Sequence, residues 1–332
     1  MALGYNRATW FRDAVRRGTD GELRRFVAQH IDTVQLFRSP HHPDPTVLAG
    51  IDAFLVGSDQ VWRRSYGDVR SYLLDFLPDD DLRPRASYAA SFGHDNIDDY
   101  EDDLMVDSAR LARRLDTVSV REDSAVKIAA NSWGVSAVHH LDPTMLLDPA
   151  IYRDLASTAS DRMPRGRLVD YVLDNDTTMR RTVSSLSKAL GEDALSLLPP
   201  HPRTYREYRS QPDRYQKRSI EGWLDAISGA RFIVTDSFHG TVFAILHNVP
   251  FVAIMNGGRG ASRFESLLDS VGLRERLVPA GAKVSSELVC KAIDWKAVNV
   301  RLSMERSRSL EYLQGFVARA QAERAESPRR HW

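Results

Sequence analysis

The chain has 332 residues, which is long enough for two domains that each bury a hydrophobic core. Its 45 Lys and Arg residues equal its 45 Asp and Glu residues, so no net charge favours nucleic acid or an anionic membrane, and an anion site has to be built locally. The single cysteine, Cys290, excludes an internal disulfide framework and a cysteine-based zinc site, which is typical of a reducing compartment.

No apolar run reaches the length of a membrane helix, and the N-terminal stretch carries Arg and Asp where a signal peptide needs apolar residues. We therefore expect a cytoplasmic protein with no nucleic-acid partner and at most peripheral contact with a membrane. The C-terminal stretch "ARAQAERAESPRRHW" ends in a basic tail. This tail could contact acidic lipid, or it could be the solvated end of a helix. The sequence is also compatible with a homo-oligomer.

Strands and helices alternate in the first half of the chain. Short β-branched and aromatic runs predict strands, and apolar spacing of three and four residues predicts helices. In chain order, we predict strands at 51–56, 86–92, 116–120 and 135–140, and helices at 107–115 and 121–134. Because parallel neighbours need helical crossovers, this alternation predicts a doubly wound parallel sheet.

Two prolines in "LDPTMLLDP" mark a domain junction, after which the alternation resumes. The predicted strands are 168–174, 230–235 and 250–255, and the predicted helices are 177–190, 221–228, 241–248 and 303–325. We therefore predict an α/β fold with two Rossmann-like domains. The first domain covers residues 1–147, on the acceptor side of a cleft, and the second covers residues 148–300, on the donor side. Residues 301–332 form a C-terminal helix that crosses back to the first domain and a basic tail that follows it.

The segment "HPRTYREYRSQPDRYQKR", residues 201–218, is basic and rich in tyrosine. This composition suits a polyanion, but its prolines and mixed polarity suit an ordinary loop equally well. The segment alone does not predict a nucleic-acid site.

His239 stands in "VTDSFHG", between a predicted strand and a predicted helix. In a parallel α/β sheet this is the ligand edge, where free N–H groups and the helix dipole favour an anion. Asp236 or Ser237 can cap the helix, and Gly240 lets a ligand approach the backbone. A capping or packing histidine is the alternative. We predict His239 as a catalytic residue, with substrate-binding neighbours Thr235, Ser237, Phe238 and Gly240.

Arg121 occupies the equivalent position in the first domain, directly after the predicted strand at 116–120. Its planar guanidinium suits a carboxylate or phosphate, and a surface ion pair with Glu122 or Asp123 is the alternative. Asp59, in the loop after the first strand, can accept a proton from a hydroxyl or cap the following turn. We predict Arg121 and Asp59 as catalytic residues, flanked by two substrate-binding residues, Ser58 and Gln60.

Other patterns predict less. Consecutive strand residues point to opposite faces, so His139 and His140 cannot chelate a metal as a pair, and no metal site is predicted. The glycine-rich stretch 257–260 lacks the Lys-Ser/Thr of a P-loop, so a nucleoside triphosphate site is not predicted. Arg259 and Arg263 can add positive charge at the ligand edge and are predicted to bind substrate.

Three stretches together resemble the polysaccharide pyruvyl transferase family: "DAFLVGSDQVW" (52–62), "SVREDSAVKIAANSWG" continuing to "LDPTMLL" (119–147), and 223–268 with its "TDSFHG" core. The resemblance spans most of the chain, and its last stretch is the most specific. It implies two domains like those of the GT-B glycosyltransferases. It also implies that the His of the "HG" pair, here His239, and an arginine at the position of Arg121 act around the donor.

The implied reaction transfers a pyruvyl group from phosphoenolpyruvate to two hydroxyls of a sugar, as a ketal, in exopolysaccharide or cell-wall biosynthesis. The partners are then phosphoenolpyruvate and a sugar acceptor, lipid-linked or polymeric. Because phosphoenolpyruvate is the donor substrate, no cofactor is expected. His239 is the acid or the phosphate clamp, Arg121 holds an anionic group, and Asp59 is the base.

The sequence departs from the family pattern at two places. Family chains usually open with a strand and an "N-Y-G" type of loop, which we do not find here, so we expect the first domain to lack its opening strand. Some members carry an arginine two residues before the histidine; here that position is Ser237, so Arg259 or Arg263 is expected to supply the charge. A nucleotide-sugar-dependent GT-B glycosyltransferase and a noncatalytic truncated relative are the alternative functions.

Overall fold

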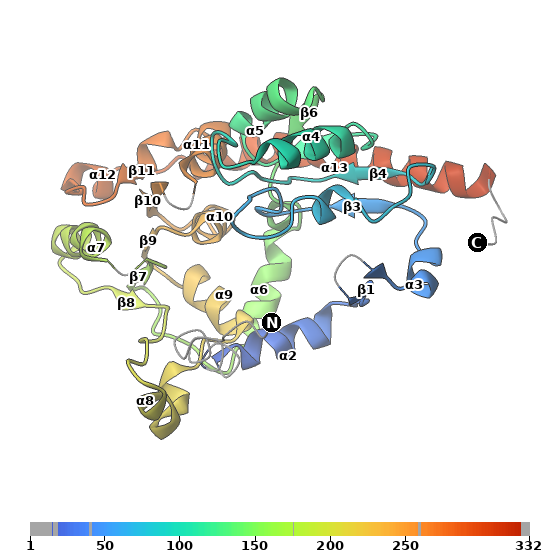
Figure 1. Ribbon diagram of the computed structural model, residues 1–332. Helices are drawn as coiled ribbons and strands as arrows, with labels where there is room; N and C mark the ends of the chain where they lie inside the picture. The colour runs from blue at the N-terminus through green and yellow to red at the C-terminus, as the bar shows by residue number, and fades with distance from the viewer. Residues whose placement is uncertain (1–14, 16–18, 40–41, 175, 258–259, 327–332) are drawn as a thin grey trace. The chain divides into compact units, whose positions relative to one another are not determined.

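The computed structural model describes residues 15, 19–39, 42–174, 176–257 and 260–326, which form two compact α/β units (Figure 1). Of the described residues, unit 1 contains those up to Thr33 together with Asp148–Ile254 and Val278–Ile293. Unit 2 contains the described residues of Val34–Leu147, Met255–Leu277 and the range from Asp294 onward. The prediction of an α/β fold with two Rossmann-like units is confirmed.

The chain crosses between the units several times, so neither unit is one continuous range of residues. Residues 19–33 belong to unit 1, where the helix α2 (Gly21–His30) places Arg25 3.3 Å from the carboxylate of Glu221. Residues 255–277 belong to unit 2, where Ser266 of α11 (Ala261–Val271) accepts a hydrogen bond of 2.9 Å from the backbone N–H of Asp123. Both segments are fixed by contacts with residues far away in the sequence.

Unit 1 is built on a five-stranded sheet in the order β8-β7-β9-β10-β11. The strands are β7 (Leu168–Tyr171), β8 (Leu195–Ser196), β9 (Phe232–Thr235), β10 (Phe251–Met255) and β11 (Leu277–Pro279). The neighbours β8/β7, β7/β9 and β9/β10 are parallel. The chain runs outward from β7 in both directions, so the topological switch point lies between β7 and β9.

Helices cover both faces of this sheet (Figure 1). On one face, Phe232 and Val234 share a core with α7 (Thr177–Leu190) and α12 (Ser286–Cys290). On the other face lie α6 (Pro149–Ser157), α9 (Ile220–Ser228) and α10 (Phe238–Leu246). There the ring of Phe243 lies 5.1 Å from Trp223 and 4.9 Å from Tyr152, both edge-on.

Unit 2 is built on four short parallel strands: β3 (Phe54–Val56), β4 (Arg85–Ser87), β5 (Val118–Val120) and β6 (Ala137–His139). β4 and β5 are joined by the hydrogen bond from Ser87 N–H to the carbonyl of Thr117, 3.2 Å. In the described residues before β3, the strands are β1 (Phe37–Ser39) and β2 (His42–Pro43), an antiparallel pair, followed by α3 (Pro45–Ala49).

The core of unit 2 gathers around Trp62, Phe92 and Trp133, whose rings lie within 5.3 Å of one another. The helices α4 (Asp102–Ala112) and α5 (Asp123–Ile128) pack on this core. The long helix α13 (Trp295–Glu326) is tied to the sheet by the Tyr312 hydroxyl, which donates to the carbonyl of Ser87 at 2.8 Å. None of the helices in the described ranges combines the length and apolarity needed to cross a bilayer.

Gly240 should be indispensable for the packing of α10 on the sheet. A Cβ atom there would lie 2.4 Å from Oγ1 of Thr235 and 3.0 Å from the ring of Tyr171. We expect Gly240→Ala to lower the free energy of unfolding by about 1–3 kcal/mol through overpacking. The control is Gly315→Ala in α13, where a Cβ atom meets no atom within 4 Å. This substitution should raise the free energy of unfolding by about 0.5–1 kcal/mol, because alanine favours a helix more than glycine does. Urea unfolding of both variants checks this, and equal effects would contradict it.

Candidate active site

In unit 1, His239 lies beside the topological switch point. β9 ends at Thr235 and α10 begins at Phe238, so His239 is in the first turn of a helix at the carboxyl end of a strand. Its side chain is half-buried. The Ser237 hydroxyl accepts from Gly240 N–H at 3.3 Å, so Ser237 is the N-cap. Because the crevice of such a sheet opens between β7 and β9, His239 borders the expected ligand position.

Buried polar groups fix the two loops that flank this crevice. Asp236 is fully buried, and its carboxylate accepts from Leu173 N–H at 2.6 Å and from Asp174 N–H at 3.1 Å. Thr235 Oγ1 donates to the carbonyl of Tyr171 at 2.6 Å and accepts from the backbone N–H of Ser237 at 3.0 Å. The turn after β9 and the loop after β7 therefore form one hydrogen-bonded structure.

The predicted neighbours of His239 are mostly inward-facing. Thr235, Ser237 and Phe238 are buried, and Thr235 and Ser237 use their hydroxyls within the turn. The ring of Phe238 lies 5.6 Å from that of His239 and perpendicular to it. Of this group, His239 is the residue that is not fully buried.

In unit 2, Arg121 is a buried cation held by two carboxylates. It follows β5, and its side chain is 1% exposed. Nη1 donates to Asp142 Oδ2 at 2.7 Å and Nη2 donates to Asp59 Oδ1 at 2.8 Å. These partners come from the carboxyl ends of β6 and β3. The surface ion pair considered for Arg121, with Glu122 or Asp123, is replaced by these longer-range pairs.

Asp142 is a site residue that sequence reasoning missed. Its side chain is 1% exposed, and Oδ1 accepts from Thr144 N–H at 3.0 Å and from the Thr144 hydroxyl at 2.6 Å. The Ser58 hydroxyl lies 3.5 Å from Oδ2. The Asp–Pro pair that marked a domain junction was the available signal, since Asp before a first-turn proline is a typical helix cap.

Asp59 lies between two buried guanidinium groups. Its side chain is 62% exposed, and Nη1 of Arg263, a residue of α11 that is itself 5% exposed, lies 3.9 Å from Oδ1. The backbone of Asp59 is in the left-handed region with φ 75°, which is uncommon for a residue other than glycine and is often found at functional sites. The structure thus brings together three predicted residues, Asp59, Arg121 and Arg263.

The charges of this cluster are unequally compensated. Burial and, after it, the positive charge of Arg121 together lower the pKa of Arg263 to about 10, although the carboxylates of Glu122 and Asp59 oppose this shift. Burial also disfavours the charged form of Arg121, but Asp142 and Asp59 outweigh it, so the pKa of Arg121 is raised. An additional anion beside Arg263 would therefore be stabilised by a desolvated positive charge.

Glu122, next to Arg121, is a second residue missed from the sequence. It is fully buried, and both the Ser91 hydroxyl and the backbone N–H of Phe92 donate to Oε1 at 2.9 Å. Burial raises the pKa of its carboxyl group, so the neutral form is favoured relative to an exposed glutamate. Glu122 thereby ties the loop after β4 to the start of α5.

Two predicted substrate-binding residues remain, Gln60 and Arg259. Gln60 is buried and accepts from Nη1 of Arg63 at 2.9 Å. A Cβ on Gly93 would lie 2.2 Å from Oε1 of Gln60, and a Cβ on Gly260 would lie 2.1 Å from the carbonyl of Gly93, so these segments are in close contact. Arg259 lies outside the described residues.

Polar side chains thus gather at the carboxyl edge of the parallel sheet in each unit, which is typical of α/β proteins that bind anionic ligands. The model of the polysaccharide pyruvyl transferase family matches residues 5–258, and the chain belongs to this family. It is therefore a transferase whose family acts on a polysaccharide or sugar acceptor. A comparison with curated proteins finds no match.

Among solved structures, the chain is similar to the UDP complex of MnaA from S. aureus, with 10% identity, a TM-score of 0.45, and coverage of 93% of this chain and 82% of that one. It is also similar to the wall teichoic acid polymerase TagF, with 10% identity, a TM-score of 0.41, and coverage of 75% and 71%. The N-terminal domain of trehalose-6-phosphate phosphatase from Candida albicans gives 8% identity, a TM-score of 0.41, and coverage of 96% and 78%.

The two carboxylates that hold Arg121 should differ in their effect on stability. Asp142→Asn removes the charge partner of a buried cation and should lower the free energy of unfolding by about 3 kcal/mol. Asp59→Asn changes an exposed carboxylate and should lower it by less than about 1 kcal/mol. Urea unfolding at pH 7 measures both. A similar loss for the two variants would show that Arg121 does not depend mainly on Asp142.

Proposed function

We propose that this chain transfers the pyruvyl group of phosphoenolpyruvate to two hydroxyls of one sugar, in a polysaccharide or its lipid-linked precursor, and forms a ketal. The observation that carries the proposal is the pair of buried guanidinium groups, Arg121 and Arg263, that face one exposed carboxylate in unit 2. Family membership supplies the class of reaction.

The donor suits this pair because it carries two anionic groups, a phosphate and a carboxylate. A guanidinium binds either group through two parallel N–H donors, and the interaction is strong where water is excluded. The Asp59 carboxylate contacts Nη2 of Arg121 and approaches Nη1 of Arg263. We propose that an anionic group of the donor takes this position and displaces Asp59 toward solvent.

The displaced carboxylate then becomes available as a base. In the proposed reaction the methylene carbon of phosphoenolpyruvate gains a proton from His239, which leaves an oxocarbenium centre at C2. A sugar hydroxyl attacks C2 and gives its proton to Asp59. The C2–O bond to phosphate breaks as the second hydroxyl attacks, and the ketal closes.

The proton balance of this scheme is complete. Of the two hydroxyl protons released, one replaces the proton that His239 gave to the methyl carbon, and the other leaves with inorganic phosphate. The scheme calls for no redox change and uses phosphoenolpyruvate as a substrate, so no cofactor enters the proposal. Removing a positioned acid or base typically slows such a step by about 10²–10⁴-fold.

A ligand comparison tests the proposal against its rivals. Phosphoenolpyruvate at millimolar concentration should raise the melting temperature, because a ligand that binds only the folded state stabilises it by mass action. UDP- and GDP-sugars should leave the melting temperature unchanged. A shift with nucleotide sugars alone would favour a glycosyltransferase, and no shift with either would favour a noncatalytic relative. With sugar acceptors, the expected product carries one carboxyethylidene group, detected by mass spectrometry.

Asp59→Asn should separate donor binding from turnover. Removing the charge that competes for Arg121 and Arg263 should tighten phosphoenolpyruvate binding about tenfold, equivalent to about 1.4 kcal/mol. Loss of the base should lower kcat at least about 100-fold. Calorimetric titration of the donor and an acceptor assay measure the two effects. Weaker donor binding in this variant would contradict displacement of Asp59.

His239→Ala should abolish transfer without unfolding unit 1. The side chain is half-buried in the first turn of α10, and the cap of that helix is supplied by Ser237. We expect kcat to fall at least about 100-fold through loss of the acid, with a melting temperature close to that of the parent chain. Circular dichroism and the ketal assay measure both. Parallel losses of folding and activity would show instead that His239 is structural.

A further inference from the structure

A basic lobe stands between β8 and α9 in unit 1. We define it as residues 203–215, which include α8 (Tyr205–Ser210) and the 3₁₀ turn η4 (Pro212–Tyr215). The lobe projects from the rest of unit 1, at the lower left of Figure 1. It carries four exposed arginines: Arg203, Arg206, Arg209 and Arg214.

The lobe is internally organised rather than an open loop. The Thr204 side chain caps α8 by accepting from Glu207 N–H at 3.1 Å. The Glu207 carboxylate in turn accepts from the backbone N–H of Arg203 at 2.9 Å and from the Tyr215 hydroxyl at 2.6 Å. The ring of Tyr208 lies 6.2 Å from those of Tyr205 and Tyr215. Glu207 is thus used to hold the lobe together.

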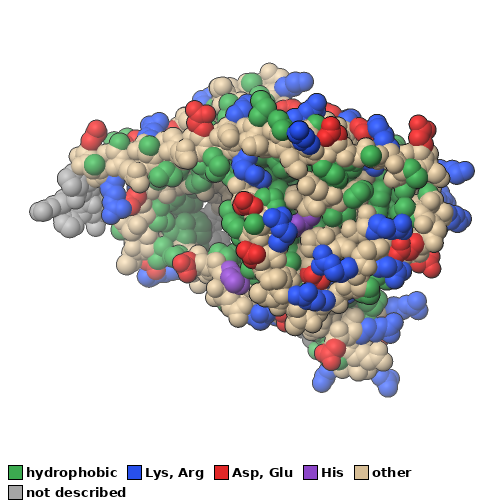
Figure 2. Space-filling model, turned by 180° about the vertical axis from the view of Figure 1, so that it is seen from behind, with side chains coloured by type: hydrophobic (Ala, Val, Ile, Leu, Met, Phe, Trp, Pro, Cys, Tyr) green, Lys and Arg blue, Asp and Glu red, His purple; other side chains and the backbone are tan. Residues whose placement is uncertain are grey.

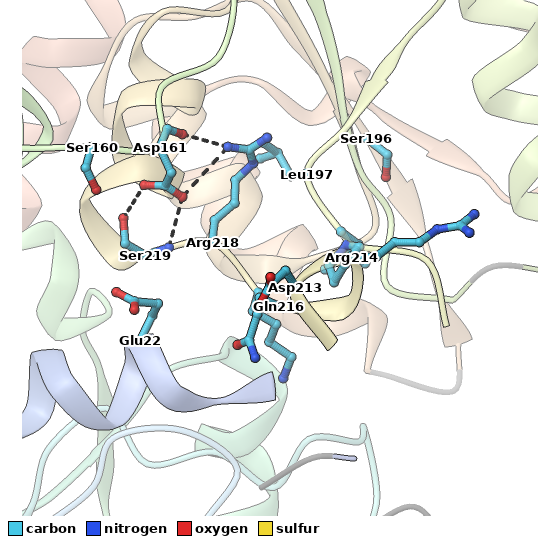
Figure 3. Close-up of a pocket in the computed structure, with 13 residues that line it drawn as sticks. Glu22, Ser160, Asp161, Ser196, Leu197, Asp213, Arg214, Gln216, Arg218 and Ser219 are labelled. Atoms are coloured by element: carbon cyan, nitrogen blue, oxygen red, sulfur yellow. Dashed lines mark hydrogen bonds and ion pairs between the residues drawn. The ribbon is translucent and has the colours of Figure 1, made fainter. Parts of the chain in front are cut away.

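The base of the lobe borders a cavity of about 470 Å³, and the two cations at its inner end, Lys217 and Arg218, have partners within the unit (Figure 3). Arg218 donates to the backbone carbonyl of Asp161 at 2.7 Å, and the Ser219 hydroxyl donates to the Asp161 carboxylate at 2.5 Å. Lys217 contacts the Asp20 carboxylate at 2.6 Å. Asp161 also lies at the N-terminus of α9, so the chain itself supplies an anion there.

The exposed arginines of the lobe differ from the cavity cations Lys217 and Arg218, because they have no carboxylate partner among the described residues. None of its four guanidinium groups forms an ion pair with a carboxylate in the part of the chain that the structure describes. The lobe contains two acidic residues, Glu207 and Asp213. Figure 3 shows Arg214 pointing away from the Asp161 cluster, and Figure 2 shows blue side chains around the projecting end at the lower right. Charge is therefore concentrated there although the whole chain is neutral.

We propose that the basic lobe docks this protein onto an anionic phospholipid surface. A projecting, convex group of arginines fits an extended flat array of phosphates, whereas a single anionic glycan chain would be enclosed by a basic groove. In the adjoining cavity, Lys217 and Arg218 are already engaged by groups of the chain. The half-buried Tyr205 and Tyr208 are amphipathic and suited to the headgroup region. The proposal rests on the lobe alone and is independent of the reaction proposed above.

Sedimentation with vesicles tests this docking. The full chain should bind vesicles of phosphatidylcholine with about 30% phosphatidylglycerol, bind pure phosphatidylcholine vesicles much less, and dissociate at about 0.5 M salt as the surface charge is screened. Arg206→Gln with Arg209→Gln should lower the partition coefficient about 25-fold, since each cation near such a surface contributes about fivefold.

The matched control is Arg110→Gln with Arg113→Gln, which removes the same charge at the same spacing from exposed positions in unit 2. It should bind vesicles like the parent chain, and circular dichroism should be unchanged for both double variants. Equal losses in the two variants, or equal binding to neutral and anionic vesicles, would overturn the proposal. Binding to a soluble acidic polysaccharide without binding to anionic vesicles would overturn it too and would identify a glycan partner.

Discussion

The buried ion pair between Arg121 and Asp142 is the constraint on which the site in unit 2 depends. A guanidinium that is 1% exposed requires a carboxylate beside it, because an unpaired buried charge is strongly destabilising. Asp142 meets this requirement from the loop after β6 while also capping the turn that contains Thr144. One carboxylate therefore fixes the direction of Arg121 and the path of the chain after β6.

Once Arg121 is fixed, the other groups of the cluster acquire distinct electrostatic roles. Arg263 adds a second buried positive charge, and Asp59 is the exposed carboxylate between the two guanidinium groups. Burial raises the pKa of the Glu122 carboxyl group, and the charge of Arg121 opposes this shift. Rotation of Asp59 into solvent would remove one carboxylate from beside the two cations, which would strengthen their attraction for an anionic donor.

The sequence predicts the regular parts of this arrangement well, because local patterns determine them. Helix α7 has the predicted bounds, since Asp176 caps its start and Gly191, with φ 65°, ends it. Each strand predicted in the two sheets is present, but most are shorter, because pairing with neighbours rather than apolar content sets their ends. α10 begins three residues before the predicted start, because Ser237 caps it, and this places His239 inside the helix.

Contacts between residues far apart in the sequence could not be predicted from local patterns. Arg121 lies near two acidic neighbours in the sequence, which suggested a local ion pair, yet its partners are 62 and 21 residues away. The direction of Arg263 depends on the close contact between Gly260, with φ 84°, and the carbonyl of Gly93. No spacing rule predicts such a contact, because it joins segments that are adjacent only in the folded unit.

The cost of this packing is itself informative about function. Holding Arg263 in a site that lowers its pKa to about 10 opposes folding, and a carboxylate nearer than the 3.9 Å approach of Asp59 would relieve it. Folding alone would favour such a carboxylate or an apolar side chain of similar volume. A buried cation beside an exposed acidic side chain is instead an arrangement in which an external anion can take the place of that side chain, so binding energy and relief of the cost of burial act in the same direction.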